Sequence, residues 1–296
     1  MEKTQLYSKQ DKLFPYTAIL PSVVLVIFIG LIPTIYTLIL SFQRYELVEP
    51  PPSYIGLTNY TMLCLRDARF LHALIFTVLF AIVATFLELV IGFFIAYLLA
   101  DKEISKSYSA LIRTVIMVPF VVAPVVVSYS FKTLIYDQTF GYLNYFFKFF
   151  SIPPFDLFKG YLNAPIGILI MEVILRTPFI VIVLYAGISS INTTIYDAAE
   201  IDGVSWYQKI ARIVVPTITP IIIVASVLRF MDVLKMFDEI YVLTAGGPGT
   251  ITENISLFAV NQAFYYFHIG YAAASAFILL VLIIIILSLF MRAFRL

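Results

Sequence analysis

Six apolar runs in the sequence are long enough to cross a lipid bilayer, and they limit the possible folds more than any other feature. A membrane-spanning helix needs about 20 consecutive apolar residues. The chain is 61% hydrophobic and 12% charged, whereas a soluble domain is about half apolar and about one quarter charged. We therefore predict an all-α integral membrane protein with six transmembrane helices near residues 14–42, 72–100, 111–136, 165–189, 214–236 and 271–292.

Prolines occur inside several of these runs. Proline removes one helical hydrogen bond and crowds the preceding turn, so it kinks or breaks a helix. In a membrane such breaks are tolerated where they face protein or water, as in a channel or transporter. We predict kinks or breaks at Pro33, Pro119, Pro124, Pro178, Pro216 and Pro220.

The residue inventory argues against several kinds of site. The single cysteine, Cys64, cannot form an internal disulfide or a thiolate metal cluster, and two histidines, His72 and His268, are too few for a zinc site. We therefore predict no metal site. A net charge of +1 provides no field that would attract nucleic acid. The sequence has no GxxxxGK[ST] phosphate loop, so any ATP must be bound by another chain.

Lysine and arginine counts predict the orientation. The N-terminal segment, the second and fourth connections and the C-terminus hold ten of these residues, and the opposite three loops hold five. Cytoplasmic segments carry the excess of positive charge. We therefore expect a multi-pass protein of the cell (plasma or inner) membrane with both termini in the cytoplasm. Residues 1–13 would be a cytoplasmic segment, not a secretory signal, and 14–292 the membrane domain.

The outer loops differ in character. Residues 44–71 contain three consecutive prolines and a turn-rich YIGLTNY, so we predict an ordered cover without a sheet. Residues 245–249 read AGGPG and predict a tight, flexible turn without regular structure. The stretch that follows, ITENISLFAVNQAFYYF (251–267), is mixed apolar and polar, which is compatible with a position at the membrane interface or partway into the membrane.

Residues 190–216 form a polar interruption between the fourth and fifth runs. Thr194, with Asp197 three positions later, predicts one helix start, and Ser205 with Gln208 predicts a second through a capping box. Gly203 between them favours the left-handed conformation that ends a helix. The pattern predicts a helix–turn–helix knob on the cytoplasmic membrane surface, suited to docking rather than to chemistry.

The same stretch resembles a known family. YDAAEIDG (196–203), followed by Pro216 and Pro220, is similar to the cytoplasmic EAA loop of permease subunits of binding-protein-dependent ABC importers. The family pattern has Glu, Ala, Ala and, six positions after the Glu, Gly. Here Asp197 occupies the Glu position, which keeps the carboxylate but shortens the side chain by one methylene.

Other motifs extend the resemblance over about residues 15–290. FDEIYVLTAGGP (237–248) is similar to the FD-x-IYVLT-x-GGP pattern of maltose-type permeases. YIGLTNY (54–60) resembles the first outer loop of the family, IRTVIMVPFVVAPVV (112–126) its third span and TPF (177–179) its fourth. The resemblance implies the type I ABC importer permease fold.

The resemblance also implies a division of labour. Two homologous, non-identical permease subunits form the pore, two ATPase subunits bind ATP and Mg²⁺, and an extracellular binding protein delivers sugar. This chain would then be no enzyme and would hold no cofactor. Its loop Gly246, Gly247 and Pro248 would face the binding protein. The residues implied in ATPase coupling are Asp197, Ala198, Ala199, Ile201, Asp202, Gly203, Val204 and Trp206.

Charged residues fall inside the predicted spans. Glu172 and Arg176 are spaced i,i+4 on the fourth span, and Arg229, Asp232 and Lys235 follow one another at i,i+3 on the fifth. A charge at the centre of a bilayer costs about 2.5–3.5 kcal/mol on insertion scales, so these side chains should face the bundle interior or a partner. Spans four and five would therefore line a polar cavity.

Two readings of these charges stay open. They line a sugar path, with Tyr129 and Phe237 among the aromatic residues that offer faces for stacking, or they neutralise one another as buried pairs that fix helix packing. Asp238 and Glu239 are interpreted as interfacial residues or loop anchors.

Three transport functions are compatible with the sequence. RFMDVLKMFD (229–238) together with Glu172 most resembles permeases for trehalose or maltose. The arginines are compatible with an ABC permease for a phosphorylated polyol. An ion-coupled secondary transporter would use Glu88 or Glu172 as a proton carrier and would need no ATPase.

Overall fold

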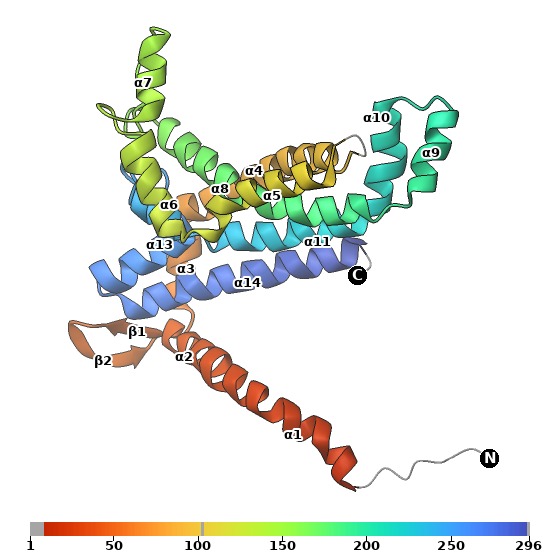
Figure 1. Cartoon of the computed structure of the whole chain (residues 1–296). Coiled ribbons are helices and arrows are strands. Elements are labelled where there is room, and N and C mark those ends of the chain that lie inside the picture. The colour runs from red at the N-terminus through yellow and green to blue at the C-terminus, as the bar shows by residue number, and fades with distance from the viewer. Residues whose placement is uncertain (1–8, 102–103, 295–296) are drawn as a thin grey trace. The chain divides into compact units, whose positions relative to one another are not determined.

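The computed structural model describes residues 9–101 and 104–294, and the helices that it contains match the six apolar runs (Figure 1). Residues 1–8 of the predicted cytoplasmic segment 1–13 lie outside the described residues. The last two residues of the chain also lie outside them. Among the described residues, five helices are long and apolar enough to cross a membrane, and a bent pair, Ser107–Val121 with Pro124–Ile135, provides a sixth candidate. The five are Tyr16–Ser41, Ala68–Leu99, Asn163–Ser189, Trp206–Leu234 and Ile269–Arg292.

The chain divides into two compact units. Unit 1 comprises residues 1–65 and 259–278, and unit 2 comprises residues 66–258 and 279–296. The last long helix, α14 (Ile269–Phe294), contributes to both, and so does the short helix α13 (Ile255–Val260).

Unit 1 begins with a continuous helix made of α1 (Lys9–Leu25), the π-helical turn η1 (Val26–Leu31) and α2 (Ile32–Ser41). The most apolar part of this helix, within Tyr16–Ser41, is not buried by other described residues. This exposure is expected for a helix that is surrounded by lipid or by another subunit. The unit continues with β1 (Gln43–Glu46), β2 (Glu49–Tyr54) and α3 (Thr58–Leu65). The π-helical turn η4 (Asn261–Tyr265) and the start of α14 complete it.

The prediction that residues 44–71 contain no sheet was wrong. Strands β1 and β2 pair antiparallel, with Gln43 opposite Tyr54 and Arg44 opposite Ser53. Each strand of a two-stranded sheet keeps one unpaired edge, so residues without an N–H are accommodated there. Asn59 of α3 donates hydrogen bonds of 2.9 Å to the carbonyls of Ser41 and Gln43, which joins the hairpin to α3.

Unit 2 contains the remaining helices and π-helical turns. They are α4 (Ala68–Leu99), α5 (Lys106–Val121), α6 (Pro124–Ser130), η2 (Phe131–Ile135), α7 (Tyr142–Phe149), α8 (Asn163–Ser189), α9 (Thr193–Ile201), α10 (Trp206–Lys209), η3 (Ile210–Val214), α11 (Val215–Leu234) and α12 (Asp238–Leu243). Helices α4, α8 and α11 pack on one another around an apolar core. Gly92 of α4 permits the close approach, because a Cβ there would lie 2.5 Å from Cγ2 of Ile180 in α8.

A break is found at one of these prolines. The chain bends by 93° between Val121 and Pro124, and Pro124 is at the start of α6. Pro119, Pro178 and Pro220 lie inside helices, which do not break at these positions. Pro33 and Pro216 lie near the beginning of α2 and α11, directly after the π-helical turns η1 and η3, where the fold has already departed from regular α-helical hydrogen bonding.

Candidate translocation site and coupling loop

A cavity of about 430 Å³ lies inside unit 2 among α6, α8, α11 and α12. Its walls are mostly ionisable side chains, although α8 and α11 belong to apolar spans. The lining residues are Pro124, Glu172, Arg176, Arg229, Asp232, Lys235, Met236, Phe237, Asp238 and Glu239. The structure therefore brings together most of the residues predicted for the substrate path.

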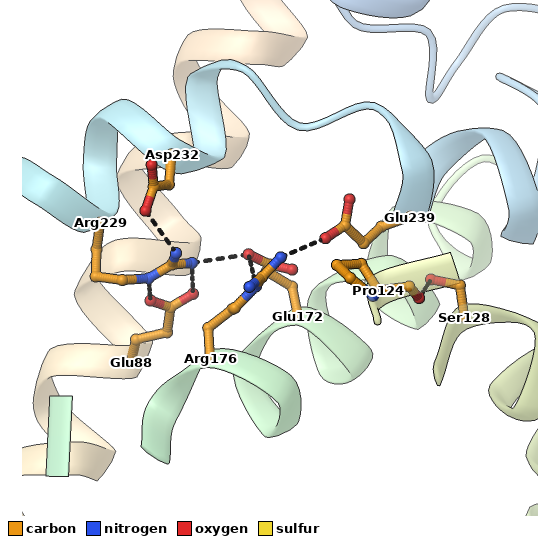
Figure 2. A network of polar contacts seen from close by, with 8 residues as sticks. All are labelled: Glu88, Pro124, Ser128, Glu172, Arg176, Arg229, Asp232 and Glu239. Atoms are coloured by element: carbon orange, nitrogen blue, oxygen red, sulfur yellow. Dashed lines mark hydrogen bonds and ion pairs between the residues drawn. The ribbon is translucent and has the colours of Figure 1, made fainter. Parts of the chain in front are cut away.

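Arg229 of α11 is the centre of a buried ion-pair network (Figure 2). Its Nε and Nη2 donate to the two carboxylate oxygens of Glu88 in α4 at 2.7 and 3.0 Å. Nη2 also donates to Oε1 of Glu172 in α8 at 2.8 Å. The side chains of Arg229, Glu88 and Glu172 are all buried. The network thus joins the three long helices of unit 2 through charge-assisted hydrogen bonds.

Arg176 extends this network to α12. Its Nη2 donates to Oε1 of Glu239 at 2.8 Å, and its Nε lies 3.7 Å from Oε1 of Glu172 (Figure 2). Glu239 is 4% exposed. Its interpretation as an interfacial residue was therefore wrong, although Asp238 is exposed at the cavity. Glu239 lies in the first turn of α12 and is paired with Arg176 of α8, a residue 63 positions earlier in the chain, so no local pattern predicts its burial.

The rim of the cavity is more open. Asp232 and Lys235 have side chains 58% and 54% exposed, and their charged atoms lie 3.4 Å apart. Phe237 stacks on Tyr241 with ring centroids 5.4 Å apart. Tyr129 of α6 is exposed and is not among the residues that line the cavity, so the structure does not bring it together with the others.

Two polar atoms in the network remain available. Oε2 of Glu172 and Nε of Arg176 are buried and have no hydrogen-bond partner among the described residues. The other oxygen of Glu172 is engaged by Arg229. A buried acceptor without a donor is unfavourable, so this oxygen is suited to accept a hydrogen bond from a solute or water.

The polar stretch between α8 and α11 folds as a helical hairpin, α9 and α10, at the ends of these helices (Figure 1). The predicted cap of the first helix at Thr194 was wrong. Asn192 is the N-cap, and its side chain accepts from the Thr194 amide at 3.0 Å. Asn is among the strongest N-cap residues, so it starts the helix earlier than the weaker Thr194–Asp197 pattern.

The turn between the two helices is as predicted. Gly203 has φ +67°, and the Val204 amide donates to the Ala199 carbonyl at 3.0 Å while the Gly203 amide donates to Glu200 at 3.1 Å. These two bonds form a Schellman motif, which ends a helix at a left-handed residue.

The start of α10 also follows the sequence prediction. Ser205 and Gln208 exchange the two hydrogen bonds of a capping box. An ion pair of 3.0 Å between Lys209 and Glu200 links α10 to α9. Tyr196, on the inner side of α9, is partly buried, and this burial raises the pKa of its hydroxyl above the ordinary value. Since α10, η3 and α11 are continuous, the hairpin is joined directly to the helix that carries Arg229.

Most of the residues predicted for ATPase coupling form the surface of this hairpin. Ile201 is 87% exposed and Trp206 66% exposed. Asp197, Ala198, Asp202 and Gly203 are exposed, Val204 is half-buried and Ala199 is buried. Ala199 therefore packs inside the hairpin, and the other residues are accessible to a partner.

The glycine-rich loop at Gly246–Pro248 is irregular but internally bonded. Thr244 and Thr252 share a hydrogen bond of 2.8 Å between their hydroxyls, and the Thr252 amide donates to the Gly246 carbonyl at 3.1 Å. Gly246 has φ +88° and the Gly247–Pro248 bond is cis. The prediction of a tight turn without regular structure is confirmed. The predicted flexibility is not what the structure shows, because these cross-bonds give the loop a defined conformation.

A family model described as the inner membrane component of binding-protein-dependent transport systems matches residues 88–295. The chain belongs to this permease family. The matched residues contain the ion-pair network, the α9–α10 hairpin and the glycine-rich loop. The resemblance on which the sequence interpretation relied is thereby confirmed, and with it a multi-pass membrane protein.

Relatives of this permease carry names of sugar transporters. The trehalose/maltose transport system permease protein MalF of Thermococcus litoralis is 32% identical over 88% of this chain and 86% of its own length. The trehalose transport system permease protein SugA of Mycobacterium tuberculosis is 29% identical over 96% and 89%. The galactooligosaccharides permease protein GanP of Bacillus subtilis is 27% identical over 79% and 57%.

A solved structure shares the fold. A chain of a bacterial ABC transporter that imports the acidic polysaccharide alginate superposes with a TM-score of 0.82 over 98% of each chain, at 20% sequence identity. The predicted fold class, an all-α ABC importer permease, is therefore confirmed.

Proposed function

We propose that this permease forms half of a translocation pore for a sugar, with a disaccharide such as trehalose or maltose as the favoured solute. The observation that carries the proposal is the cavity on α8, α11 and α12, whose wall includes a buried Glu172 oxygen without a hydrogen-bond partner among the described residues. The names of the relatives, which include trehalose, maltose and galactooligosaccharide transporters, support the solute class.

The chemistry of the cavity suits a neutral, hydroxyl-rich solute. Glu172 Oε2 and the exposed carboxylate of Asp232 accept hydrogen bonds from hydroxyls, Lys235 donates to them, and Phe237 offers an apolar edge. The two readings of the charges are thus compatible. Arg229 holds the helices together, and the atoms that this pairing leaves over bind the solute.

A phosphorylated polyol fits the cavity less well. A phosphate group would need an uncompensated cation, but Arg229 is bonded to two carboxylates, Arg176 is bonded to Glu239, and Lys235 at the rim is paired with Asp232. Burying an anion beside these carboxylates would be strongly unfavourable.

An ion-coupled mechanism is also disfavoured by the geometry. A proton carrier must become neutral during the cycle. Glu88 and Glu172 both bond to Arg229, so protonating either one removes a partner of a buried guanidinium.

The energy source in this proposal lies on other chains. The exposed hairpin α9–α10 would insert into a surface groove of one of two ATPase subunits, which bind ATP and Mg²⁺, while this chain holds no cofactor. Its exposed apolar residues Ile201 and Trp206 are suited to such a contact. With the hairpin and both termini in the cytoplasm, Gly246–Pro248 would face an extracellular binding protein.

The remaining partner would be a homologous, non-identical permease. One of the solved structures similar in fold is an alginate ABC transporter in complex with its periplasmic protein. That assembly supports the arrangement proposed for the binding protein.

The test is uptake by the complete complex in lipid vesicles. The permease is purified with the subunits that co-purify with it, and uptake of labelled trehalose, maltose and sorbitol phosphate is measured with its binding protein outside and ATP or no nucleotide inside. We expect ATP-dependent uptake of a neutral sugar. Uptake driven by a proton gradient without nucleotide, or uptake of the phosphorylated polyol alone, would contradict the proposal.

A further inference from the structure

The segment that follows the glycine-rich loop, residues 252–255 (the anchor segment), is polar and nevertheless buried. Thr252, Glu253 and Asn254 are 0%, 1% and 2% exposed. Burying polar groups is unfavourable unless they form hydrogen bonds. The partners of these side chains therefore indicate what the segment does.

On one side the anchor segment is bonded to the first turns of α4. Arg69 donates two hydrogen bonds of 2.6 and 2.7 Å to the carboxylate of Glu253. The Ile255 amide donates to the hydroxyl of Thr77 at 3.0 Å. A bidentate arginine–carboxylate pair fixes orientation as well as distance, so α4 holds the segment in one position.

On the other side the segment is bonded to the corner between α11 and α12. The side-chain amide of Asn254 donates to the carbonyl of Met236, and its oxygen accepts from the Leu257 amide at 2.9 Å. Met236 lies between the end of α11 at Leu234 and the start of α12 at Asp238. Carbonyls at a helix C-terminus lack helical donors, and Asn254 supplies one from a distant part of the sequence.

This corner forms part of the cavity wall. Lys235, Met236 and Phe237 all line the cavity, and α12, which follows directly, carries Glu239 to Arg176. We propose that Asn254 is a positioning residue that holds this corner against α4 and thereby sets the shape of the solute cavity. The effect on solute passage rests on the proposed function, whereas the tether itself does not.

Two variants separate the tether from the rest of the segment. Asn254→Ser keeps an oxygen for the Leu257 amide but is too short to reach Met236. Asn254→Asp keeps the shape and lacks the donor, and it serves if the serine variant does not assemble. Asn144→Ser is the matched control, because Asn144 is also buried and bonds to the backbone of Asp137 and Phe155, neither of which lines the cavity.

The complete complex in lipid nanodiscs is used to measure amide hydrogen exchange over residues 233–243, and vesicles are used to measure trehalose and maltose uptake per ATP hydrolysed. We expect faster exchange at this corner and about a fivefold lower uptake per ATP in the Asn254 variants alone. A loss of folded complex lowers uptake and hydrolysis together and leaves their ratio unchanged.

Unchanged exchange at the corner, or an equal increase in the Asn144 control, would overturn the tether. Faster exchange with an unchanged uptake ratio would overturn the positioning role. If the unmodified complex transports neither sugar, the proposed function fails, and the exchange measurement still decides whether Asn254 holds the corner.

Discussion

Arg229 and Glu88 lie 141 positions apart in the chain and share two hydrogen bonds of 2.7 and 3.0 Å inside the helix bundle. A bidentate pair of this kind is orientation-specific, and both residues are buried. In unit 2, α4 and α11 are therefore held in register by this bidentate ion pair as well as by apolar packing.

Removing one partner of this pair should destabilise the permease. Arg229→Ala leaves the buried carboxylate of Glu88 without its ion-pair partner and Glu172 with only the 3.7 Å contact to Arg176, so we expect a loss of roughly 3–5 kcal/mol of stability, measured by thermal unfolding of the purified complex. The double variant Arg229→Met with Glu88→Met should recover much of it. Arg44→Met, which removes the exposed pair with Glu46, is the control and should change stability by about 1 kcal/mol or less. An unchanged unfolding midpoint in Arg229→Ala would show that the pair does not fix packing.

The free oxygen of Glu172 should matter for transport more than for assembly. Glu172→Gln keeps an acceptor for Arg229 and places an N–H where the unpartnered oxygen now lies. We expect uptake of sugar per ATP hydrolysed to fall by about tenfold, because one favourable hydrogen bond becomes an unfavourable contact. Glu88→Gln is the control, since Glu88 bonds to the same arginine but does not line the cavity. Equal losses in both variants would assign Glu172 to packing alone.

The turn of the α9–α10 hairpin should be sensitive to backbone conformation alone. A side chain at Gly203 meets nothing within 4 Å, but φ is +67°. Gly203→Val should therefore strain the turn by about 1–2 kcal/mol and reduce co-purification of ATPase subunits. Gly203→Asn should retain most of the co-purification of ATPase subunits, because Asn tolerates this backbone conformation.

Gly56 provides the control for this experiment. It has φ +60° and equally open surroundings, but it belongs to the loop before α3. Gly56→Val should leave ATPase binding unchanged. If both valine variants lose the ATPase, the effect reflects misfolding and the hairpin has no specific role.

Gly92 should tolerate no side chain while Ile180 is present. An alanine Cβ would lie 2.5 Å from Ile180 Cγ2, so Gly92→Ala should destabilise the complex by roughly 1–3 kcal/mol through overpacking. Gly30→Ala, at a helical position with nothing within 4 Å, should be neutral or slightly stabilising. The thermal unfolding midpoints of both variants are compared. Ile180→Ala is then added to Gly92→Ala, and this double variant should recover part of the lost stability.

Local signals in the sequence predicted local structure well. The apolar runs predicted the spans, and Ser205 with Gln208 predicted a capping box that the structure contains. Their causes lie within a few residues of each other. The break at Pro124 belongs to the same class, because proline acts on its own turn.

Features that depend on distant partners could not be predicted. Glu239 is buried because Arg176 reaches it from α8, and Glu88 pairs with an arginine 141 positions away. The β1–β2 hairpin formed despite its prolines, because only one edge of each strand must bond. Nothing in the vicinity of Asn254 indicates that its amide bonds to Met236.

The break before Pro124 has a consequence for permeation. Helix α5 has 16 residues, and at about 1.5 Å per residue it is shorter than a hydrocarbon core of about 30 Å. Backbone carbonyls released at membrane depth are tolerated only against protein or water, and Pro124 lines the cavity. The wall of this cavity is thus formed partly by a break in the main chain. Under the proposed function, the side chains that contact the solute can be exchanged for those suited to another sugar while this part of the wall stays the same.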